Sequence, residues 1–477
     1  MRHRILLSIV SLAFAGLTIF LAYFVQRTDF QTFIAAYTAF FGGYVWVVFY
    51  QQKQFSQAEI RYLIWLGIGL RVILLFSIPN LSDDYARFLW DGHLTVAGIH
   101  PFVHTPAYFI DNQIFPPGIT PELFSKLNSQ GYYTVYPPVC QAVFALAAWL
   151  FPTNELGGVF VLKLFLLACE IGTIWILEHR TSPIPPIPPI VSIKKTWFGG
   201  IGGIGEARCS LLYALNPLII LEICGNCHFE GAMIFFLLAG IAALQHGNIA
   251  KGAIWWALAT ASKMLPVLFL PIVWRWLGWR KGLVFNLIFG ICCIALFAPV
   301  LAVLPNILES LDLYFRKFQF NASIYYLVRE VGISKTGWDI GARSGPVLGG
   351  LTVLGVLIIA ALTKPFARGN LQEGLNPNVS GLNTLYTALV FALFLYLSFS
   401  ATIQPWYVAV PLALSLGTHW RFMIAWSGLV MLSYSHYDGG GRQEQYGLIL
   451  LEYTLIWMYF IWELRRIFLP KPAHISS

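Results

Sequence analysis

Apolar stretches of roughly 20 residues recur along the whole chain, and each has the length at which a helix crosses a bilayer core of about 30 Å. Hydrophobic residues make up 57% of the 477 residues and charged residues only 11%, with a mean hydropathy of +0.68. Soluble domains carry about 25% charged residues. We therefore predict an all-α polytopic membrane protein with about 12–14 transmembrane helices.

The positions of the basic residues predict how the spans are oriented across the membrane. The first three spans are expected at residues 5–25, 31–50 and 62–78, and the connector at 51–61 contains Lys53 and Arg61. The positive-inside rule places this connector and both termini in the cytoplasm. We therefore expect a multi-pass protein of the plasma (inner) membrane, with the polar stretch after the third span on the extracytoplasmic side. Further spans are expected near residues 139–151, 157–177, 211–223, 232–244, 283–304, 346–362, 385–399, 406–416, 422–434 and 448–462. The segment at 251–276 is expected either as two short crossings or as a re-entrant pair that meets at residues 262–266.

The spans and polar stretches divide the chain into segments. They are N-terminal helices at 1–79, an extracytoplasmic catalytic loop with interfacial helices at 80–136, helices at 137–181, a Pro/Gly-rich cytoplasmic linker at 182–207, helices at 208–304, a second extracytoplasmic loop at 305–345, C-terminal helices at 346–464 and a cytoplasmic tail at 465–477. The linker contains a formal G-x-G-x-x-G motif, but no strand precedes it, so nucleotide binding is discarded. Basic residues are not clustered enough for nucleic-acid binding.

Asp83 and Asp84 lie at the border between the third span and the first loop. Carboxylates are costly in hydrocarbon, so this pair is expected at the membrane–water boundary, facing a cavity. Ser82 is predicted as an N-cap, which places both carboxylates in the first turn of a helix. Asp84, Arg87 and Asp91 then share one face and are expected to form a charged cluster. A capped amphipathic helix with a solvated salt bridge is the alternative.

We also predict the surroundings or the partners of other side chains near this border. Phe88, Leu89, Val96 and Ala97 are expected along the membrane surface, on the apolar side of an interfacial helix. Lys163 and Glu170 share a face of one span and are predicted to pair with each other. Arg71, inside the third span, needs a partner or a cavity.

The polar motifs all fall at the face opposite to the basic loops. They are SDDYAR, YPP, CGNCHFEG, FNASIYY, ATIQPW and SHYDGGGRQEQ. This convergence is typical of a membrane enzyme with an extracytoplasmic site. A transporter more often has polar groups at the midplane, in broken helices repeated between two halves.

These groups are suited to glycosyl transfer from a polyprenyl phosphate. A carboxylate can act as the general base on an acceptor hydroxyl. Arg, Lys or His side chains can hold the phosphate of a lipid-linked donor and neutralise its charge as it leaves. With one base and no carboxylate nucleophile, a single displacement with inversion is expected.

The first loop resembles that of bacterial GT-C class membrane glycosyltransferases, the polyprenol-phosphate-mannose-type mannosyltransferase group. The matching motif is S-D-D-x-x-R-[FY]-L-W-D-G followed by A-G-I-x-P-[FY], at residues 82–92 and 97–102. The similarity continues at Tyr136-Pro137-Pro138 with Gln141, Asn216-Pro217-Leu218 with Glu222, His228, Lys263 with Pro266, residues 320–323 and Pro405-Trp406-Tyr407. The chain departs from the group at Glu230, where Asp is usual, and at Gln404, where His is expected.

The resemblance implies that the acidic pair supplies the catalytic carboxylate, with Asp83 as the base and Asp84 as its partner or an acceptor ligand. The candidate substrate- and donor-binding residues are Arg87, Asp91, His93, Tyr136, His228, Glu230, Lys263, Arg329 and Trp406. Arg87 and Asp91 would hold the geometry of the loop. A helix-end or snorkelling role is the alternative for His228, Lys263 and Arg329.

The implied partners are a polyprenyl-phosphate hexose donor, a glycan, lipid or protein acceptor, and the bilayer. No metal ligands are assigned, and a requirement for a divalent metal stays open. Two other functions also stay open. A lipid-glycan flippase or exporter would act without transfer, and an aminosugar transferase of the same architecture would differ only in its donor.

Overall fold

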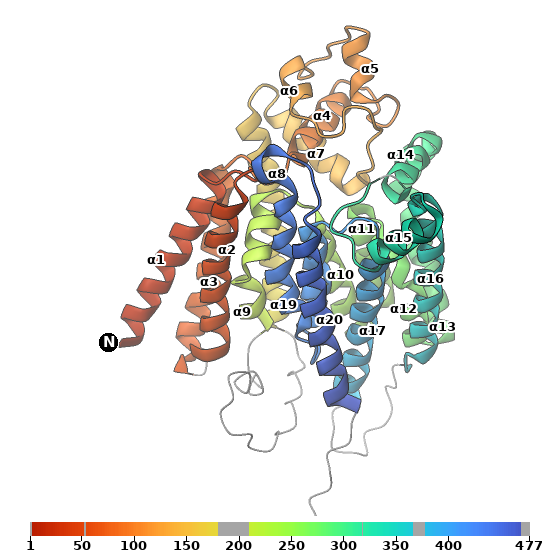
Figure 1. Cartoon of the computed structure of the whole chain (residues 1–477). Helices are drawn as coiled ribbons and strands as arrows, with labels where there is room; N and C mark the ends of the chain where they lie inside the picture. Colours follow the sequence, from red (N-terminus) through yellow and green to blue (C-terminus); the bar gives the residue numbers. More distant parts are fainter. Residues whose placement is uncertain (1, 52–53, 180–208, 317, 366–376, 469–477) are drawn as a thin grey trace, which may run out of the picture.

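The computed structural model describes the chain except for residues 1, 52–53, 180–208, 317, 366–376 and 469–477. Long helices lie side by side in one bundle, and shorter helices lie across one end of it (Figure 1). The described residues contain no β-strand beyond an isolated bridge between Phe320 and Thr402. The predicted all-α class is therefore confirmed, whereas the predicted linker at 182–207 lies outside the described residues.

Among the described residues, six helices are long and apolar enough to cross a membrane. They are α1 (Arg2–Tyr23), α2 (Phe30–Val45) continued by the π-helical η1 (Trp46–Gln51), α8 (Glu155–Glu178), α13 (Trp279–Leu301), α16 (Gly341–Leu362) and α20 (Tyr446–Phe468). The pair η5 (Ile219–Gly225) and α10 (Glu230–Gln245), bent by 108°, makes a seventh if it counts as one span. Leu12, Trp175 and Leu287 are more than half exposed on these helices, as expected of side chains that contact lipid.

Many of the other expected spans are broken into shorter helices, so uninterrupted spans are fewer than the predicted 12–14. The shorter elements are α3 (Gln57–Ile73), η3 (Leu74–Phe76), α7 (Pro138–Leu150), α9 (Cys209–Ala214), α11 (Ile249–Ser262), η6 (Leu265–Phe269), α12 (Leu270–Leu277), η7 (Pro405–Val408), α18 (Ala409–Ser415), α19 (Phe422–Leu429) and η8 (Val430–Gly440). Helix α17 (Pro377–Phe399) is continuous. Pro217, Pro266 and Pro405 lie at three of the breaks, because proline has no N–H to continue a helical ladder.

Charged side chains buried among these helices have partners that differ from those predicted. Arg71 forms an ion pair with Glu170 at 3.0 Å, and Tyr213 donates a hydrogen bond to the same carboxylate at 2.6 Å. Lys163 instead donates to the carbonyl and hydroxyl oxygens of Ser77, at 2.6 and 2.8 Å. The predicted pair of Lys163 with Glu170 was therefore wrong, because the end of a neighbouring helix offers Lys163 free carbonyl groups.

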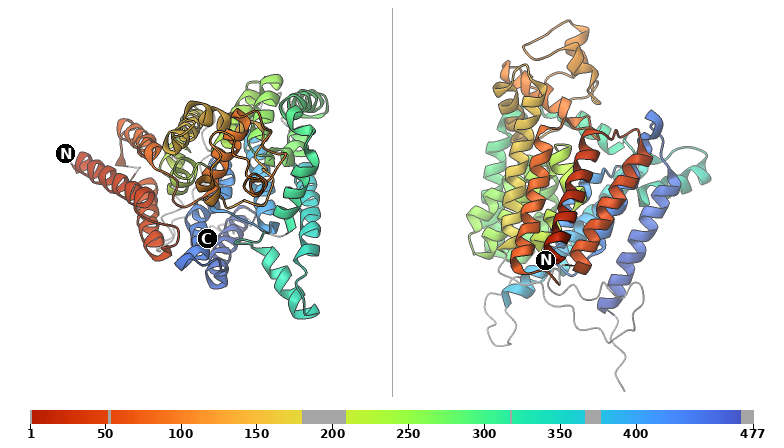
Figure 2. Two further views of the ribbon diagram at one scale, coloured as in Figure 1. Left: turned by 90° about the horizontal axis from the view of Figure 1, so that it is seen from above. Right: turned by 90° about the vertical axis from the view of Figure 1, so that its left-hand side faces the viewer.

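The short helices predicted in the first loop are present as α4 (Asp84–Val96), α5 (Pro106–Asp111) and α6 (Pro121–Ser125). Viewed from above, they lie over the middle of the bundle (Figure 2). The second loop contributes α14 (Leu304–Arg316) and α15 (Ile324–Thr336) at the same end (Figure 1). Both loops therefore cover one end of the bundle.

Helix α4 packs on the protein itself. Phe88 stacks on Phe144 of α7 with ring centroids 4.5 Å apart, and Leu89 lies against Gly158 of α8. Both Phe88 and Leu89 are buried, so their predicted place along the membrane surface was wrong. Aromatic and branched side chains fill the interior here, because α7 and α8 offer them a closely matched surface.

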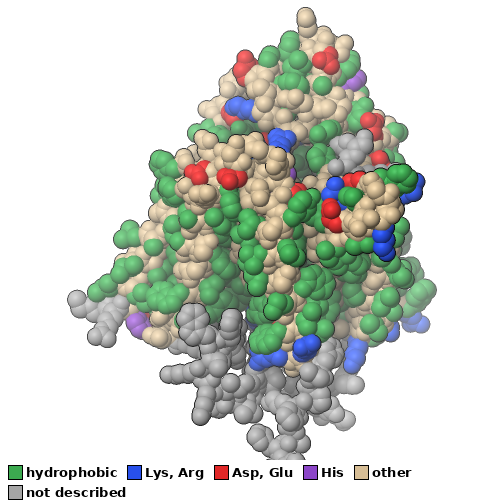
Figure 3. Space-filling model, viewed as in Figure 1, with side chains coloured by type: hydrophobic (Ala, Val, Ile, Leu, Met, Phe, Trp, Pro, Cys, Tyr) green, Lys and Arg blue, Asp and Glu red, His purple; other side chains and the backbone are tan. Residues whose placement is uncertain are grey.

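The two ends of the bundle differ in charge. On the face seen in Figure 3, the acidic side chains lie in the upper half together with several Lys and Arg side chains, whereas the charged side chains visible at the lower end are Lys and Arg. The last turn of α20 contributes Arg465 and Arg466 to the lower end. Apolar side chains cover the flanks between the two levels.

Candidate active site

The acidic pair lies where α4 begins. Asp83 is the N-cap residue, with φ −94° and ψ 0°, and its side chain makes no capping hydrogen bond. The hydroxyl of Ser82 accepts a hydrogen bond from the Asp84 N–H at 3.3 Å. The predicted cap at Ser82 was therefore one residue early, because Asp83 already has near-helical backbone angles. Only Asp84 lies in the first turn, where the helix dipole favours a negative charge.

The two carboxylates have different partners. Asp83 forms an ion pair with Arg27 from the turn between α1 and α2. Asp84 accepts a hydrogen bond from the Asn128 side-chain amide at 2.9 Å. Asp84 is also close enough to act electrostatically on His228 and Lys263. Asp84 therefore faces the predicted donor-binding residues, whereas Asp83 faces the N-terminal helices.

Five of the predicted binding residues meet near this pair. His228, in the break between η5 and α10, stacks on Trp406 of η7 with ring centroids 3.5 Å apart and planes 14° apart. Lys263, at the end of α11, has its Nζ 3.1 Å from Glu230 Oε1. The same Nζ lies over the ring of Tyr136, 5.5 Å from its centroid. A cation, an imidazole and aromatic faces from distant parts of the chain thus come together.

His228 is held in place by a buried network. Its Nε2 lies 3.4 Å from Glu222 Oε2. The Glu222 carboxylate accepts hydrogen bonds from the Tyr434 hydroxyl at 2.8 Å and from the Asn226 amide at 3.2 Å. All four side chains are buried. The orientation of the imidazole is therefore set by groups behind it, as is usual for functional histidines.

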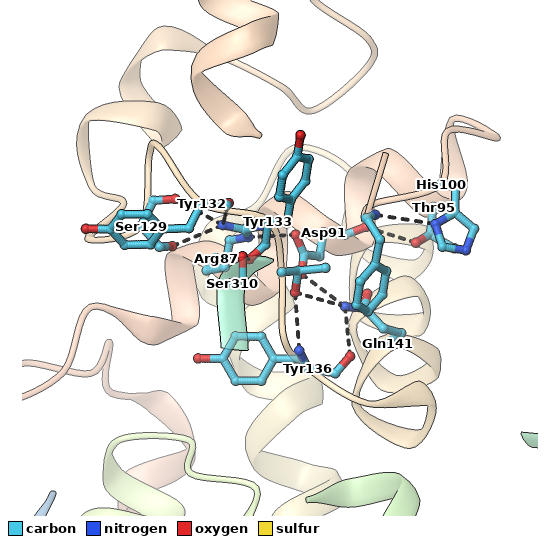
Figure 4. Close-up of polar contacts among 12 residues, drawn as sticks. Arg87, Asp91, Thr95, His100, Ser129, Tyr132, Tyr133, Tyr136, Gln141 and Ser310 are labelled. Atoms are coloured by element: carbon cyan, nitrogen blue, oxygen red, sulfur yellow. Dashed lines mark hydrogen bonds and ion pairs between the residues drawn. The ribbon is translucent and has the colours of Figure 1, made fainter. Parts of the chain in front are cut away.

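Arg87 and Asp91 form the core of the loop (Figure 4). Arg87 Nε donates to Asp91 Oδ1 at 2.8 Å, and its Nη1 donates to the carbonyl oxygens of Ser129 and Tyr132, both at 3.0 Å. Gln141 donates to the other Asp91 oxygen at 3.0 Å. Both charged side chains are almost fully buried. The pair therefore ties α4 to the later part of the loop and to α7, the geometric role foreseen for it.

The predicted charged cluster of Asp84, Arg87 and Asp91 was wrong for Asp84. The Asp84 carboxylate is bound by Asn128, whereas Arg87 uses its donors on Asp91 and on loop carbonyls. Spacing along a helix allows Asp84 to reach Arg87, but the folded-back loop offers each side chain a nearer partner.

Two other predicted binding residues are engaged elsewhere. His93 is buried against Gly118, whose φ of +85° and missing side chain leave room for the imidazole. Burial lowers the pKa of His93, which favours its neutral form. Arg329 donates to Asp339 at 2.8 Å and to Glu330 at 3.0 Å. The hydrogen bond from Arg329 holds the pKa of Asp339 below its ordinary value.

The second loop is joined to the segment that contains Trp406. The Phe320 N–H donates to the carbonyl of Ala401 at 3.0 Å, and the Ile403 N–H donates to the carbonyl of Phe320 at 2.8 Å. Asn321, at a φ of +47°, donates its N–H to Glu444 at 3.2 Å. The motifs FNASIYY and ATIQPW therefore lie side by side, next to the stacked His228 and Trp406.

Comparison with known proteins points to sugar transfer. A family model described as Alpha-(1->6)-mannopyranosyltransferase, N-terminal domain, matches residues 200–278. Alpha-(1->6)-mannopyranosyltransferase A from Mycobacterium tuberculosis is 24% identical over 240 residues, which cover 46% of this chain and 41% of that protein. The predicted resemblance to mannosyltransferases is confirmed. The alignment spans less than half of either chain.

The matched residues 200–278 contain three residues of the candidate site, His228, Glu230 and Lys263. The described part of this stretch extends from α9 to α12, so it includes both helix breaks at which these side chains meet. The similarity therefore covers part of the site itself.

Three residues of the site were missed by sequence reasoning. Arg27 binds Asp83, and its guanidinium lies 4.9 Å from the ring centroid of Tyr437. Asn128 binds Asp84. One signal was available for Arg27, because it follows the first span at the end opposite to the basic connector, where lysine and arginine are not favoured. Tyr437 lies in the motif SHYDGGGRQEQ, which was expected at the same face, but its contact with Arg27 was not predicted. Nothing in the spacing of Asn128 indicated its position.

The arrangement can supply a base, a cation and flat faces for a sugar at one end of an apolar bundle. The cation is Lys263, whose side chain is a quarter exposed. Among the residues that the structure describes, no group of three or more His, Cys, Asp or Glu side chains is placed to hold a metal ion.

Proposed function

We propose that this chain is an integral-membrane glycosyltransferase that moves a mannose-like hexose from a polyprenyl-phosphate donor to the hydroxyl of an extracytoplasmic acceptor. The observation that carries this proposal is the meeting of Lys263, His228 and Trp406 in one group, which the Asp84 carboxylate of the acidic pair faces. The partial similarity to mannosyltransferases supports the reaction class.

The donor phosphate is assigned to Lys263. A lysine ammonium binds phosphate as a point charge, and Glu230 holds this one in place at 3.1 Å. The His228–Trp406 stack, with ring centroids 3.5 Å apart, provides a flat face and an imidazole beside it. Aromatic faces contribute apolar contact with a fixed geometry, which suits the apolar face of a hexose. The polyprenyl chain would lie among the apolar helices below.

The base is assigned to the acidic pair. Asp83 accepts the proton of the acceptor hydroxyl, and the hydroxyl oxygen forms a bond to the anomeric carbon as the bond to the phosphate oxygen breaks. The polyprenyl phosphate leaves with the electron pair of that bond, beside the positive charge of Lys263. Asp84, held by Asn128, is the partner of the base or an acceptor ligand. One displacement inverts the anomeric carbon.

The site is assigned to the extracytoplasmic face and both termini to the cytoplasm. The basic side chains at the opposite end of the bundle support this orientation, because cytoplasmic ends of spans are enriched in lysine and arginine. The acceptor is a glycan, a lipid or a protein that presents a hydroxyl at this face.

The test is transfer of labelled hexose from a polyprenyl-phosphate donor in membranes that contain the wild-type chain or its variants. Loss of a general base lowers the rate by about 100-fold or more, so we expect that loss for Asp83→Asn and a smaller one for Asp84→Asn. Asp111→Asn, an exposed carboxylate of the same loop, is the matched control. Full activity of both acidic-pair variants would refute the catalytic assignment, and flipping of labelled lipid without transfer would indicate a flippase.

A further inference from the structure

The turn between α1 and α2 reaches the acidic pair through one side chain. The Arg27 guanidinium contacts Oδ2 of Asp83 and lies 4.9 Å from the centroid of the Tyr437 ring. The side chains of Arg27 and Asp83 are 22% and 34% exposed, so the pair is partly shielded from water but open to a substrate. Three segments that are far apart in the sequence therefore meet at one carboxylate.

The backbone on either side of Arg27 is hydrogen-bonded to the segments that contain Asp83 and Tyr437. The side-chain amide of Asn80, three residues before Asp83, donates to the carbonyl of Leu21 at 2.8 Å and to that of Val25. On the other side of the turn, the Gly439 N–H donates to the carbonyl of Thr28 at 2.9 Å. The guanidinium is thus held from two directions before any substrate binds.

We infer that Arg27 is a positioning residue that orients the Asp83 carboxylate for proton transfer, with Tyr437 as the support of the guanidinium. The inference rests on the proposed function. An arginine–carboxylate hydrogen bond is charge-assisted and directional, and an aromatic face adds a cation–π contact to the guanidinium. Because Arg27 holds Oδ2 of Asp83, the other oxygen, Oδ1, is assigned to the acceptor proton.

The alternative is that Arg27 only ties the turn to α4. The two roles differ in what a substitution changes. A misplacement of a catalytic group by about 1 Å can cost about 100-fold in rate, whereas a lost surface tie lowers stability and leaves the turnover of the folded protein unchanged. Lysine keeps the charge at this position but not the planar fork of donors.

The experiment compares steady-state transfer by the purified full-length chain and its variants, with a polyprenyl-phosphate hexose as donor. We expect Arg27→Ala to lower kcat by about 10–100-fold, with the donor KM changed less than about twofold. Arg27→Lys is expected to lie between Arg27→Ala and wild type. Added millimolar guanidinium is expected to restore part of the activity of Arg27→Ala and none of that of Asp83→Asn. Lys126→Ala, which removes an exposed ion pair with Glu155, is the matched control.

Two variants of Tyr437 test whether its ring supports the Arg27 guanidinium. Tyr437→Leu removes the cation–π contact and is expected to lower kcat without raising the donor KM, whereas Tyr437→Phe keeps the ring under the guanidinium and is expected to lower kcat less. Equal activity of both variants would overturn the supporting role of Tyr437.

The outcomes separate this inference from the proposed function. A wild-type kcat for Arg27→Ala together with an inactive Asp83→Asn would overturn the inference alone. A lower kcat that guanidinium does not restore, with a lower melting temperature, would show a structural tie and also overturn it. Full activity of Asp83→Asn and Asp84→Asn would refute the proposed function as well. If Arg27→Ala does not fold, the kcat of Arg27→Lys decides, and a wild-type value contradicts the inference.

Discussion

Arg87 and Asp91 show how a buried charged pair holds the first loop together. The two side chains are 3% and 0% exposed, and Arg87 Nη1 donates to the carbonyls of Ser129 and Tyr132. Removing one charge leaves the other buried without a partner, which costs more than the pair contributes.

We therefore predict that Arg87→Met destabilises the folded protein by about 3–5 kcal/mol, measured as a lower melting temperature of the purified chain. The double variant Arg87→Met/Asp91→Leu should regain part of the loss, because no unpaired charge remains. An unchanged melting temperature for Arg87→Met would contradict a structural role for the pair.

Trp406 is predicted to act on donor binding. Its ring stacks on His228, and an aromatic pair is worth about 0.5–1.5 kcal/mol beyond its buried area. Trp406→Leu should therefore raise the donor KM by about 3–10-fold, with a smaller effect on kcat. Trp149→Leu is the control, since Trp149 is 67% exposed on α7. An unchanged donor KM would exclude the stack from the donor site.

The side chains that the sequence singled out and the structure assembled have a common property. Lys263 interrupts an apolar stretch, whereas His228 and Trp406 belong to short polar motifs between two such stretches, so their polarity or their motif stands out against the surroundings. Arg27 and Asn128 do not, because one follows a span and the other lies in an already polar loop. Their roles come from tertiary contacts with the acidic pair, which no local pattern encodes.

At the scale of elements, the contact between α4 and α7 fixes where the acidic pair lies. Gly92 makes this contact possible, because a Cβ at this position would lie 2.2 Å from the carbonyl oxygen of Phe144. The sequence predicted α4 itself, but its amphipathic pattern fitted a membrane surface and a protein surface equally well. Both are apolar, so composition alone does not distinguish them.

Gly92→Ala is therefore predicted to push α4 away from α7. Overpacking of this kind costs about 1–3 kcal/mol, and the same displacement should lower transfer activity because it moves Asp83 and Asp84. Gly16→Ala is the matched control, since no heavy atom lies within 4 Å of a Cβ built on Gly16. A Gly92→Ala protein with wild-type melting temperature and activity would contradict this packing.

At the scale of the whole molecule, the apolar composition was enough to predict a helical membrane bundle with polar loops at one end. Composition alone was not enough to predict where helices break. Lys263 and Pro266 did indicate one break, because the segment at 251–276 was expected as two short crossings or a re-entrant pair, and it forms α11, η6 and α12 with the break at Lys263. Polar groups of the backbone at such breaks need partners from other helices, and those partners are set by the tertiary fold.

A separate prediction concerns which end of the bundle lies outside the cell. In a variant that retains activity after its native cysteines are replaced, Asn112→Cys in the first loop should react with a membrane-impermeant maleimide on intact cells. His246→Cys, after α10, should react only in permeabilised cells. Both positions are exposed. The reverse pattern of labelling would place the candidate site in the cytoplasm.

We propose that the acidic pair and the Lys263 group enclose one lipid-linked sugar. A structure of the full chain with a bound polyprenyl-phosphate hexose is the decisive measurement. We expect the donor phosphate within about 3 Å of Lys263 Nζ, the hexose against the His228–Trp406 stack, and its anomeric carbon facing Asp83 or Asp84. A donor phosphate bound at the opposite end of the bundle, or a hexose remote from both carboxylates, would contradict this proposal.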